Sequence, residues 1–160
     1  MIPEDGFQKS IGWPETKNGS AEQGRREMKS IHPTEQQIRK FLAKKESGPI
    51  VMINLLKFKK EIDSDGHTGE DRYDRYMIHV APILKNLGGR LLWMGTVDQV
   101  FIGSEEEDKW DRVLLVEYPS RTSFFQMISD PAYLEIHKDR EIALERSALL
   151  PSKTIMSMIS

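Results

Sequence analysis

The segment Ile50–Phe58 constrains the fold of this chain more than any other, because it is apolar almost without interruption. β-Branched residues such as Val51 and Ile53 are frequent in it, and Gly48-Pro49 stands directly before it. A run of this length and composition is typical of a β-strand that is buried on both faces. The fold must therefore contain a sheet that is covered at this strand.

Helical patterns lie on both sides of this strand in the sequence. Thr34 and Gln37 have the spacing of a capping box, which predicts that a helix begins there and continues to Ser47-Gly48-Pro49. A second helix is predicted from about Glu70 to Leu87, with an apolar stripe along one face. Pro82 lies inside it, and we expect this proline to kink or divide the helix.

Two further strands are predicted after the second helix, at Arg90–Ile102 and Trp110–Tyr118. The acidic segment Gly103–Lys109 connects them as a hairpin loop. The first of the two strands is long, so we expect a break or a bulge near Asp98-Gln99.

The last third of the chain completes the order of elements. Ser120 is a helix cap for a short helix, and Asp130-Pro131 is a start signal for a helix that is expected to continue to about Arg146. A final strand is predicted at Leu149–Ile159. Apart from the extra N-terminal helix the order is β-α-β-β-α-β, which predicts a ferredoxin-like α+β fold with one antiparallel sheet and two helices on one face.

The length of 160 residues is that of one compact domain. Residues 32–160 are predicted to form a single ferredoxin-like α+β domain, and residues 1–31, which lack apolar periodicity, an irregular arm. The chain contains no cysteine. This excludes a disulfide framework, a thiolate nucleophile and a cysteine-ligated metal site.

Charge and hydrophobicity exclude further classes of partner. Lys and Arg number 23 against 25 Asp and Glu, a net charge of −2, so we expect neither nucleic acid nor an anionic membrane surface as a partner. The N-terminus lacks the pattern of a secretory signal, and no apolar run has the length of a membrane span. The expected location is cytoplasmic.

Asn54 is the polar residue least expected in its strand, and it needs a hydrogen-bond partner from the protein or from a ligand. Lys57 at the strand end could meet an anionic ligand or be solvated. Tyr76 and His79 project from neighbouring turns of one helix, either as a solvated pair or as a proton carrier beside a phenol. Trp93 is either a core residue or an apolar wall of a pocket.

These five residues, Asn54, Lys57, Tyr76, His79 and Trp93, are the candidate ligand-binding residues. The four histidines do not share the spacing of ligands on one helix face, so neither a metal nor a cofactor is predicted. Motifs for phosphate, dinucleotide and zinc binding are absent from the sequence, as is the nucleophile elbow of hydrolases.

Several motifs together resemble a bacterial family called domain of unknown function 1330. They are G-P-I-V-M-I-N-L-L-K-F, Y-D-R-Y, W-D-R-V-L-L-V-E-Y-P-S-R and D-P-A-Y, within residues 33–150. This family belongs to the dimeric α+β barrel superfamily. The resemblance implies a ferredoxin-like subunit, two copies of which pack their sheets into a barrel, and it implies no particular reaction.

The sequence therefore favours a homodimer that binds a small organic molecule in a cleft between helices and sheet. One hypothesis is a cofactor-independent monooxygenase, isomerase or decarboxylase, in which His79, Tyr76 and Asn54 handle protons and orient an oxyanion. The alternative is a non-catalytic ligand-binding module or a structural dimer.

Overall fold

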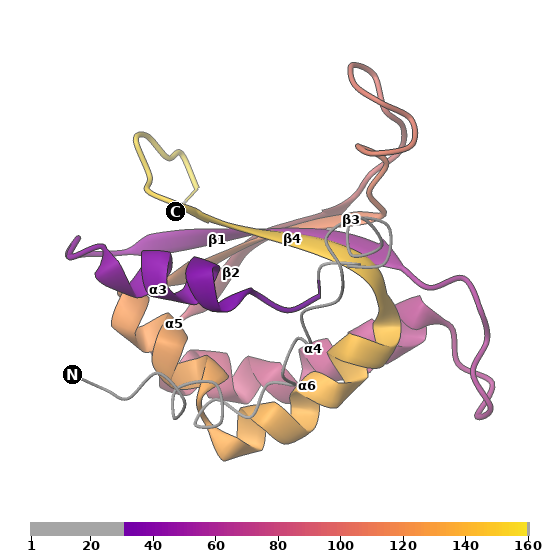
Figure 1. Ribbon diagram of the computed structural model, residues 1–160, viewed down its shortest axis with the longest axis horizontal. Helices are drawn as coiled ribbons and strands as arrows, with labels where there is room; N and C mark the ends of the chain where they lie inside the picture. Colours follow the sequence, from indigo (N-terminus) through magenta and orange to yellow (C-terminus); the bar gives the residue numbers. More distant parts are fainter. Residues whose placement is uncertain (1–30, 160) are drawn as a thin grey trace.

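The computed structural model describes residues 31–159. Its four strands form one antiparallel sheet in the order β2-β3-β1-β4, and its helices all lie on one side of that sheet (Figure 1). This is the predicted ferredoxin-like α+β fold. In chain order the elements are α3 (Glu35–Ala43), β1 (Ile50–Phe58), α4 (Gly69–Asn86), β2 (Arg90–Thr96), β3 (Arg112–Tyr118), α5 (Arg121–Ile128), α6 (Pro131–Ala143) and β4 (Leu144–Ser152).

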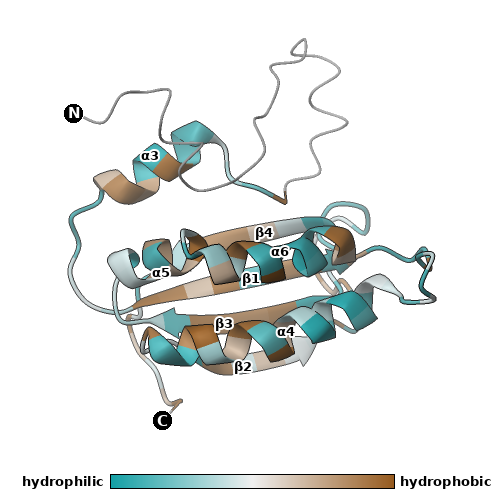
Figure 2. Ribbon diagram, turned by 90° about the horizontal axis from the view of Figure 1, so that it is seen from below, coloured by the Kyte–Doolittle hydropathy of each residue, from teal (hydrophilic) through white to brown (hydrophobic). Residues whose placement is uncertain are grey.

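The apolar run that forms β1 lies inside the sheet, between β3 and β4. Alternate residues of this strand face the helices, and Met52 and Leu56 are 2% and 0% exposed. Leu114 of β3 lies beside Asn54 in the register and points to the same side. The core is therefore the layer between the sheet and helices α4, α5 and α6 (Figure 2).

The opposite face of the sheet carries a row of apolar residues across all four strands. The register places Trp93, Leu115, Ile53 and Leu150 side by side in that row. Trp93 is 49% exposed and Leu150 is 48% exposed. None of helices α3 to α6 covers this face (Figure 1), so β1 is fully covered only on its helix side.

The predicted helix starts are confirmed. Thr34 and Thr68 both form capping boxes, in which each hydroxyl accepts from a backbone N–H three residues later. Asp130 is the N-cap of α6, with Pro131 at its first position. Pro82 does not divide α4, which continues to Asn86. Pro82 cannot donate to the carbonyl of Ile78, four residues earlier. Both residues are exposed, so water can bond that carbonyl instead.

The prediction for the last helix and strand was wrong in its boundaries. Helix α6 ends at Ala143, and β4 begins at Leu144 because that residue already pairs with Phe58 of β1. The strand ends at Ser152, so Ile155, which was expected in a strand, is exposed. Glu145 and Arg146 made this edge strand resemble a solvated helix end. Strand pairing with β1 outweighs that local pattern.

The β2–β3 hairpin also differs from its predicted strand boundaries. Strand β2 ends at Thr96, before the expected break, and its register shifts between Leu91 and Trp93. A long loop then leads to β3. Apart from Ile31, the predicted arm of residues 1–31 lies outside the described residues. Among the described helices, none combines the length and apolarity needed to cross a membrane.

Candidate ligand-binding site

A cavity of about 550 Å³ lies between the helix side of the sheet and the helices. This volume is within the range of small-molecule pockets. Met52 and Leu114 form part of its floor, and Phe124 and Met127 of α5 form part of its wall. Residues of α3, among them Phe41, close it on another side.

Helix α3 is held at the cavity by contacts with α5. The rings of Phe41 and Phe124 meet edge to face with centroids 5.5 Å apart. The guanidinium of Arg121 lies 4.6 Å from the centre of the Phe41 ring and donates to the Phe41 carbonyl. The extra N-terminal helix is therefore a wall of the cavity.

Arg140 of α6 is the most unusual polar group at the cavity, because it is only 7% exposed and forms no ion pair with a carboxylate of the described chain. Its guanidinium donates to the carbonyl of Ile31 at 3.3 Å and to the hydroxyl of Ser147 at 3.4 Å. Burial opposes its charge, but the phenols of Tyr133, Tyr73 and Tyr76 keep its pKa above the ordinary value. The cavity wall therefore carries a fixed positive charge.

A second buried arginine shows how the same fold neutralises such a charge elsewhere. Arg112 of β3 is 8% exposed, and it donates to Asp74 and to Glu70, each at 2.7 Å. A buried cation is stable when it is paired in this way. Arg140 has neutral hydrogen-bond acceptors in the described chain but no such counter-ion.

Three side chains beside Arg140, those of Tyr76, Tyr133 and His137, are linked by hydrogen bonds, and a fourth, Glu141, contacts the last of them. The hydroxyl of Tyr76 lies 3.5 Å from that of Tyr133, and the Tyr133 oxygen lies 3.1 Å from Nδ1 of His137. Nε2 of His137 lies 3.4 Å from Oε1 of Glu141. The His137–Glu141 contact lies outside hydrogen-bond geometry. Because the Tyr133 oxygen accepts from Tyr76, its own proton is available to Nδ1 of His137 in the tautomer that carries the ring proton on Nε2.

The electrostatic environment keeps the side chains of Tyr76, Tyr133 and His137 uncharged at neutral pH. Burial, the Arg140 charge and His32 together lower the pKa of His137 to about 3. Burial raises the pKa of Tyr133 to about 12. His32, whose pKa is also lowered by burial, contacts Glu141 from the segment before α3. Both imidazoles are therefore neutral at neutral pH.

Two groups of described residues have ligand atoms within 4.8 Å of one another, the distance range of a metal site. In the first, His32, His137 and Glu141, the nearby Arg140 opposes a divalent cation. In the second, at residues 63–67, Arg72 already binds the carboxylates of Asp63 and Asp65. We therefore assign neither group to a metal.

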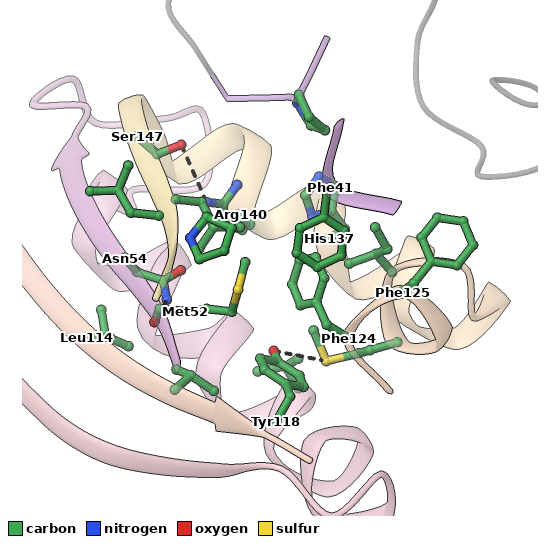
Figure 3. A pocket seen from close by; sticks show the side chains of 18 of the residues that line it. Phe41, Met52, Asn54, Leu114, Tyr118, Phe124, Phe125, His137, Arg140 and Ser147 are labelled. Carbon is green, nitrogen blue, oxygen red and sulfur yellow. Dashed lines mark hydrogen bonds between the residues drawn. The ribbon is translucent and has the colours of Figure 1, made fainter. Parts of the chain in front are cut away.

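The structure brings two of the five predicted site residues to the cavity, Asn54 and Tyr76. The Asn54 amide donates to the Met52 carbonyl at 3.1 Å. In Figure 3 its side chain lies on the floor of the same cavity as Arg140 and His137.

The other three do not line the cavity. Lys57, which follows Leu56 in β1, is not among the lining residues and pairs with Asp111 at 3.1 Å. His79 is exposed on α4, which excludes it from proton transfer with Asn54, and Trp93 lies on the helix-free face. The three-residue interval puts His79 and Tyr76 on neighbouring turns of α4. It does not determine whether both side chains are buried.

Sequence reasoning missed Tyr133, His137 and Arg140. They stand at intervals of four and three residues, so they share one face of α6. The available signal was that a histidine and an arginine occupy positions where an amphipathic helix would otherwise carry apolar side chains.

Comparison with known proteins gives a family and a fold. The family model called domain of unknown function (DUF1330) matches residues 66–153. A crystal structure of a protein of unknown function from Rhodopseudomonas palustris is 35% identical, with a TM-score of 0.73, over 79% of this chain and 98% of that chain. Its methylated form gives 35% identity and a TM-score of 0.72, over 80% of this chain and 96% of that chain.

More distant similarity extends to a dimeric protein of unknown function with a ferredoxin-like fold from Bacteroides fragilis. It is 11% identical, with a TM-score of 0.47, over 66% of this chain and 96% of that chain. No curated protein matches the chain. The family model covers more than half of the sequence, and the match to the R. palustris protein includes nearly all of that protein. The chain belongs to the DUF1330 family.

Proposed function

We propose that the protein binds a small organic molecule with one anionic group, a carboxylate or an enolate, in the cavity beside α6. The observation that carries this proposal is the buried guanidinium of Arg140, which has no carboxylate partner in the described chain. A planar guanidinium matches the two oxygens of a carboxylate with parallel hydrogen bonds. The anion of the ligand completes the pairing that Arg112 obtains from Asp74 and Glu70.

The rest of the cavity supports a largely apolar ligand body. Its lining is dominated by aliphatic and aromatic side chains such as Met52, Leu114 and Phe124. Asn54, which lines the cavity from β1, is a second polar anchor (Figure 3). A cavity of this kind, apolar with a few converging polar groups, is typical of sites for small organic molecules.

The helix-free face of the sheet supports the second part of the proposal, a homodimer in which two sheets pack against each other. The row formed by Trp93, Leu115, Ile53 and Leu150 is apolar and partly exposed in the single chain. An exposed apolar surface of this extent marks an interaction site. Such packing would cover the second face of β1 and place the two ligand cavities on the outer sides of the assembly.

The ligand proposal is tested with two probes that differ only in charge, 2-naphthylacetate and the neutral 2-naphthylacetamide. We expect calorimetry to show the acid binding at least about tenfold more tightly than the amide, a difference of about 1.4 kcal/mol. Arg140→Met should remove this preference, because it deletes the guanidinium at similar side-chain volume.

His79→Gln is the matched control, since His79 is exposed and does not line the cavity. This variant should bind both probes as the unmodified protein does. Equal binding of acid and amide by the unmodified protein would contradict the role of Arg140 as a counter-ion.

A further inference from the structure

We propose that the same cavity catalyses the keto–enol isomerisation of a 2-oxo carboxylate, with Tyr133 as the residue that transfers the proton and His137 and Glu141 as its positioning residues. This inference rests on the proposed function, because Arg140 must first bind the substrate carboxylate. It goes further by naming the substrate class and the reaction.

The first support is the geometry of the relay. Tyr133 lines the cavity and lies 3.1 Å from Nδ1 of His137, whose Nε2 lies 3.4 Å from Glu141. A hydroxyl, an imidazole and a carboxylate in this order form the arrangement that activates a hydroxyl for proton transfer. Glu141 is 37% exposed at its side chain, so the relay also connects the cavity to solvent.

The second support is that the relay and the fixed positive charge face one cavity. When the C3–H bond of the substrate breaks, its electron pair forms the C2=C3 double bond, and the carbonyl π pair moves onto oxygen. That oxyanion develops beside Arg140, which is already charged and already in place. The proton moves to the Tyr133 oxygen while the Tyr133 proton moves to His137.

The cycle closes without any co-reactant. The proton on His137 returns through Tyr133 to the enolate oxygen, so one C–H bond is broken and one O–H bond is formed. Glu141 stabilises the imidazolium for as long as it exists. Tyr76, whose hydroxyl lies 3.5 Å from that of Tyr133, donates to the phenol oxygen and holds it in place.

Substrate binding also makes His137 a stronger base. Burial is the main cause that holds the pKa of His137 at about 3, and the charges of Arg140 and His32 lower it further. A bound carboxylate neutralises part of that charge and so raises the pKa of His137. Substrate binding and the basicity of His137 are therefore coupled through Arg140.

The experiment follows the loss of the C3 proton signal of phenylpyruvate by NMR in D₂O, with the full chain and in parallel with calorimetry on the same probe. We expect the protein to accelerate exchange, and Tyr133→Phe to lower kcat by at least about 100-fold, the lower bound for a positioned acid–base group. Tyr133→Phe should leave the Kd within about twofold, because Arg140 still binds the carboxylate.

His137→Gln and Glu141→Gln test the positioning roles. Each should lower kcat with KM nearly unchanged, and His137→Gln should also change the pH dependence of kcat, which a residue with a purely structural role would not do. His79→Gln is the control and should exchange phenylpyruvate at the rate of the unmodified protein. Thermal melts of every variant verify that it is folded.

The outcomes separate the two proposals. If phenylpyruvate binds through Arg140 and its exchange is no faster than in buffer, the relay is overturned and the proposed function stands. If phenylpyruvate does not bind while 2-naphthylacetate does, the 2-oxo acid class is overturned. If neither acid binds, both proposals fall. If EDTA abolishes exchange and zinc restores it, a metal at the histidines replaces the relay.

Discussion

At the scale of single residues, Arg140 is expected to serve binding at the expense of stability. A buried charge without a counter-ion is unfavourable, and replacing buried ionic groups by apolar ones of similar volume is often neutral or stabilising. We therefore expect Arg140→Met to melt at the same or a higher temperature than the unmodified protein while losing the acid ligand. Differential scanning calorimetry in the absence of ligand measures this. A large fall in Tm with unchanged binding would contradict this. It would show that Arg140 stabilises the fold through its hydrogen bonds to Ile31 and Ser147.

His137 predicts how stability depends on pH. Its pKa is about 3 in the folded chain, because of burial, Arg140 and His32, and 6.5 in the unfolded chain, so the unfolded state binds the extra proton first. Stability should therefore fall as the pH decreases from about 6.5 toward about 3. The groups that face this imidazole are Arg140, Glu141, His32 and Tyr133.

The measurement is Tm as a function of pH for the unmodified protein and for His137→Gln. The variant should lose Tm less steeply below pH 6.5, whatever its Tm at neutral pH. His32, whose pKa is also lowered by burial, accounts for part of the remaining slope. Parallel curves for the two proteins would contradict the buried, neutral state of His137.

The candidate site was predictable from the sequence only in part, for a physical reason. Asn54 could be found because a polar residue in an apolar strand must have a partner, and strand alternation fixes its face. Arg140 and His137 lie on a helix whose apolar pattern is weak, so the only signal for them was a polar residue type on the face of Tyr133. His79 was placed wrongly because α4 turns Tyr76 inward and leaves His79 in solvent.

At the scale of the elements, side-chain caps mark helix starts. The capping box at Thr34 was predicted from the sequence, and the structure shows a second one at Thr68. Thr68 accepts from the backbone N–H of Asp71, and the Asp71 carboxylate accepts from the N–H of Thr68. Removing one partner of this capping box by Thr68→Ala should lower the free energy of unfolding by about 1 kcal/mol. Urea denaturation measures this, with the exposed Thr154→Ala as a control that should change little. Equal stability of the two variants would contradict the role of the cap.

The boundaries that were mispredicted are those set by pairing between distant segments. Leu144 belongs to β4 because it pairs with Phe58. The sequence around Leu144 contains no signal that predicts this pairing. Helix α3 was predicted from its capping box, but its role as a cavity wall depends on Phe124, more than 80 residues away in the chain. Local sequence thus predicts where an element begins more reliably than what it contacts.

At the scale of the whole molecule, the helix-free face predicts the assembly. Trp93→Glu puts a charge into the apolar row of the proposed sheet-to-sheet interface, where burying it without a partner would be costly. We expect this variant to sediment as a monomer in analytical ultracentrifugation while the unmodified protein sediments as a dimer. His79→Glu, on the opposite side of the molecule, should remain a dimer. A monomeric unmodified protein at micromolar concentration would contradict the proposed homodimer.

The lone guanidinium in the cavity has a consequence for how the protein behaves in the test tube. Small carboxylates such as acetate and citrate carry the group that Arg140 is proposed to bind, so they will compete with any natural ligand. An anion that binds only the folded state raises its Tm in proportion to the logarithm of concentration once the site is nearly full. Acetate buffer should thus raise the Tm of the unmodified protein more than that of Arg140→Met. In carboxylate buffers the apparent Kd of any other ligand will exceed its true Kd, because the buffer anion occupies part of the sites.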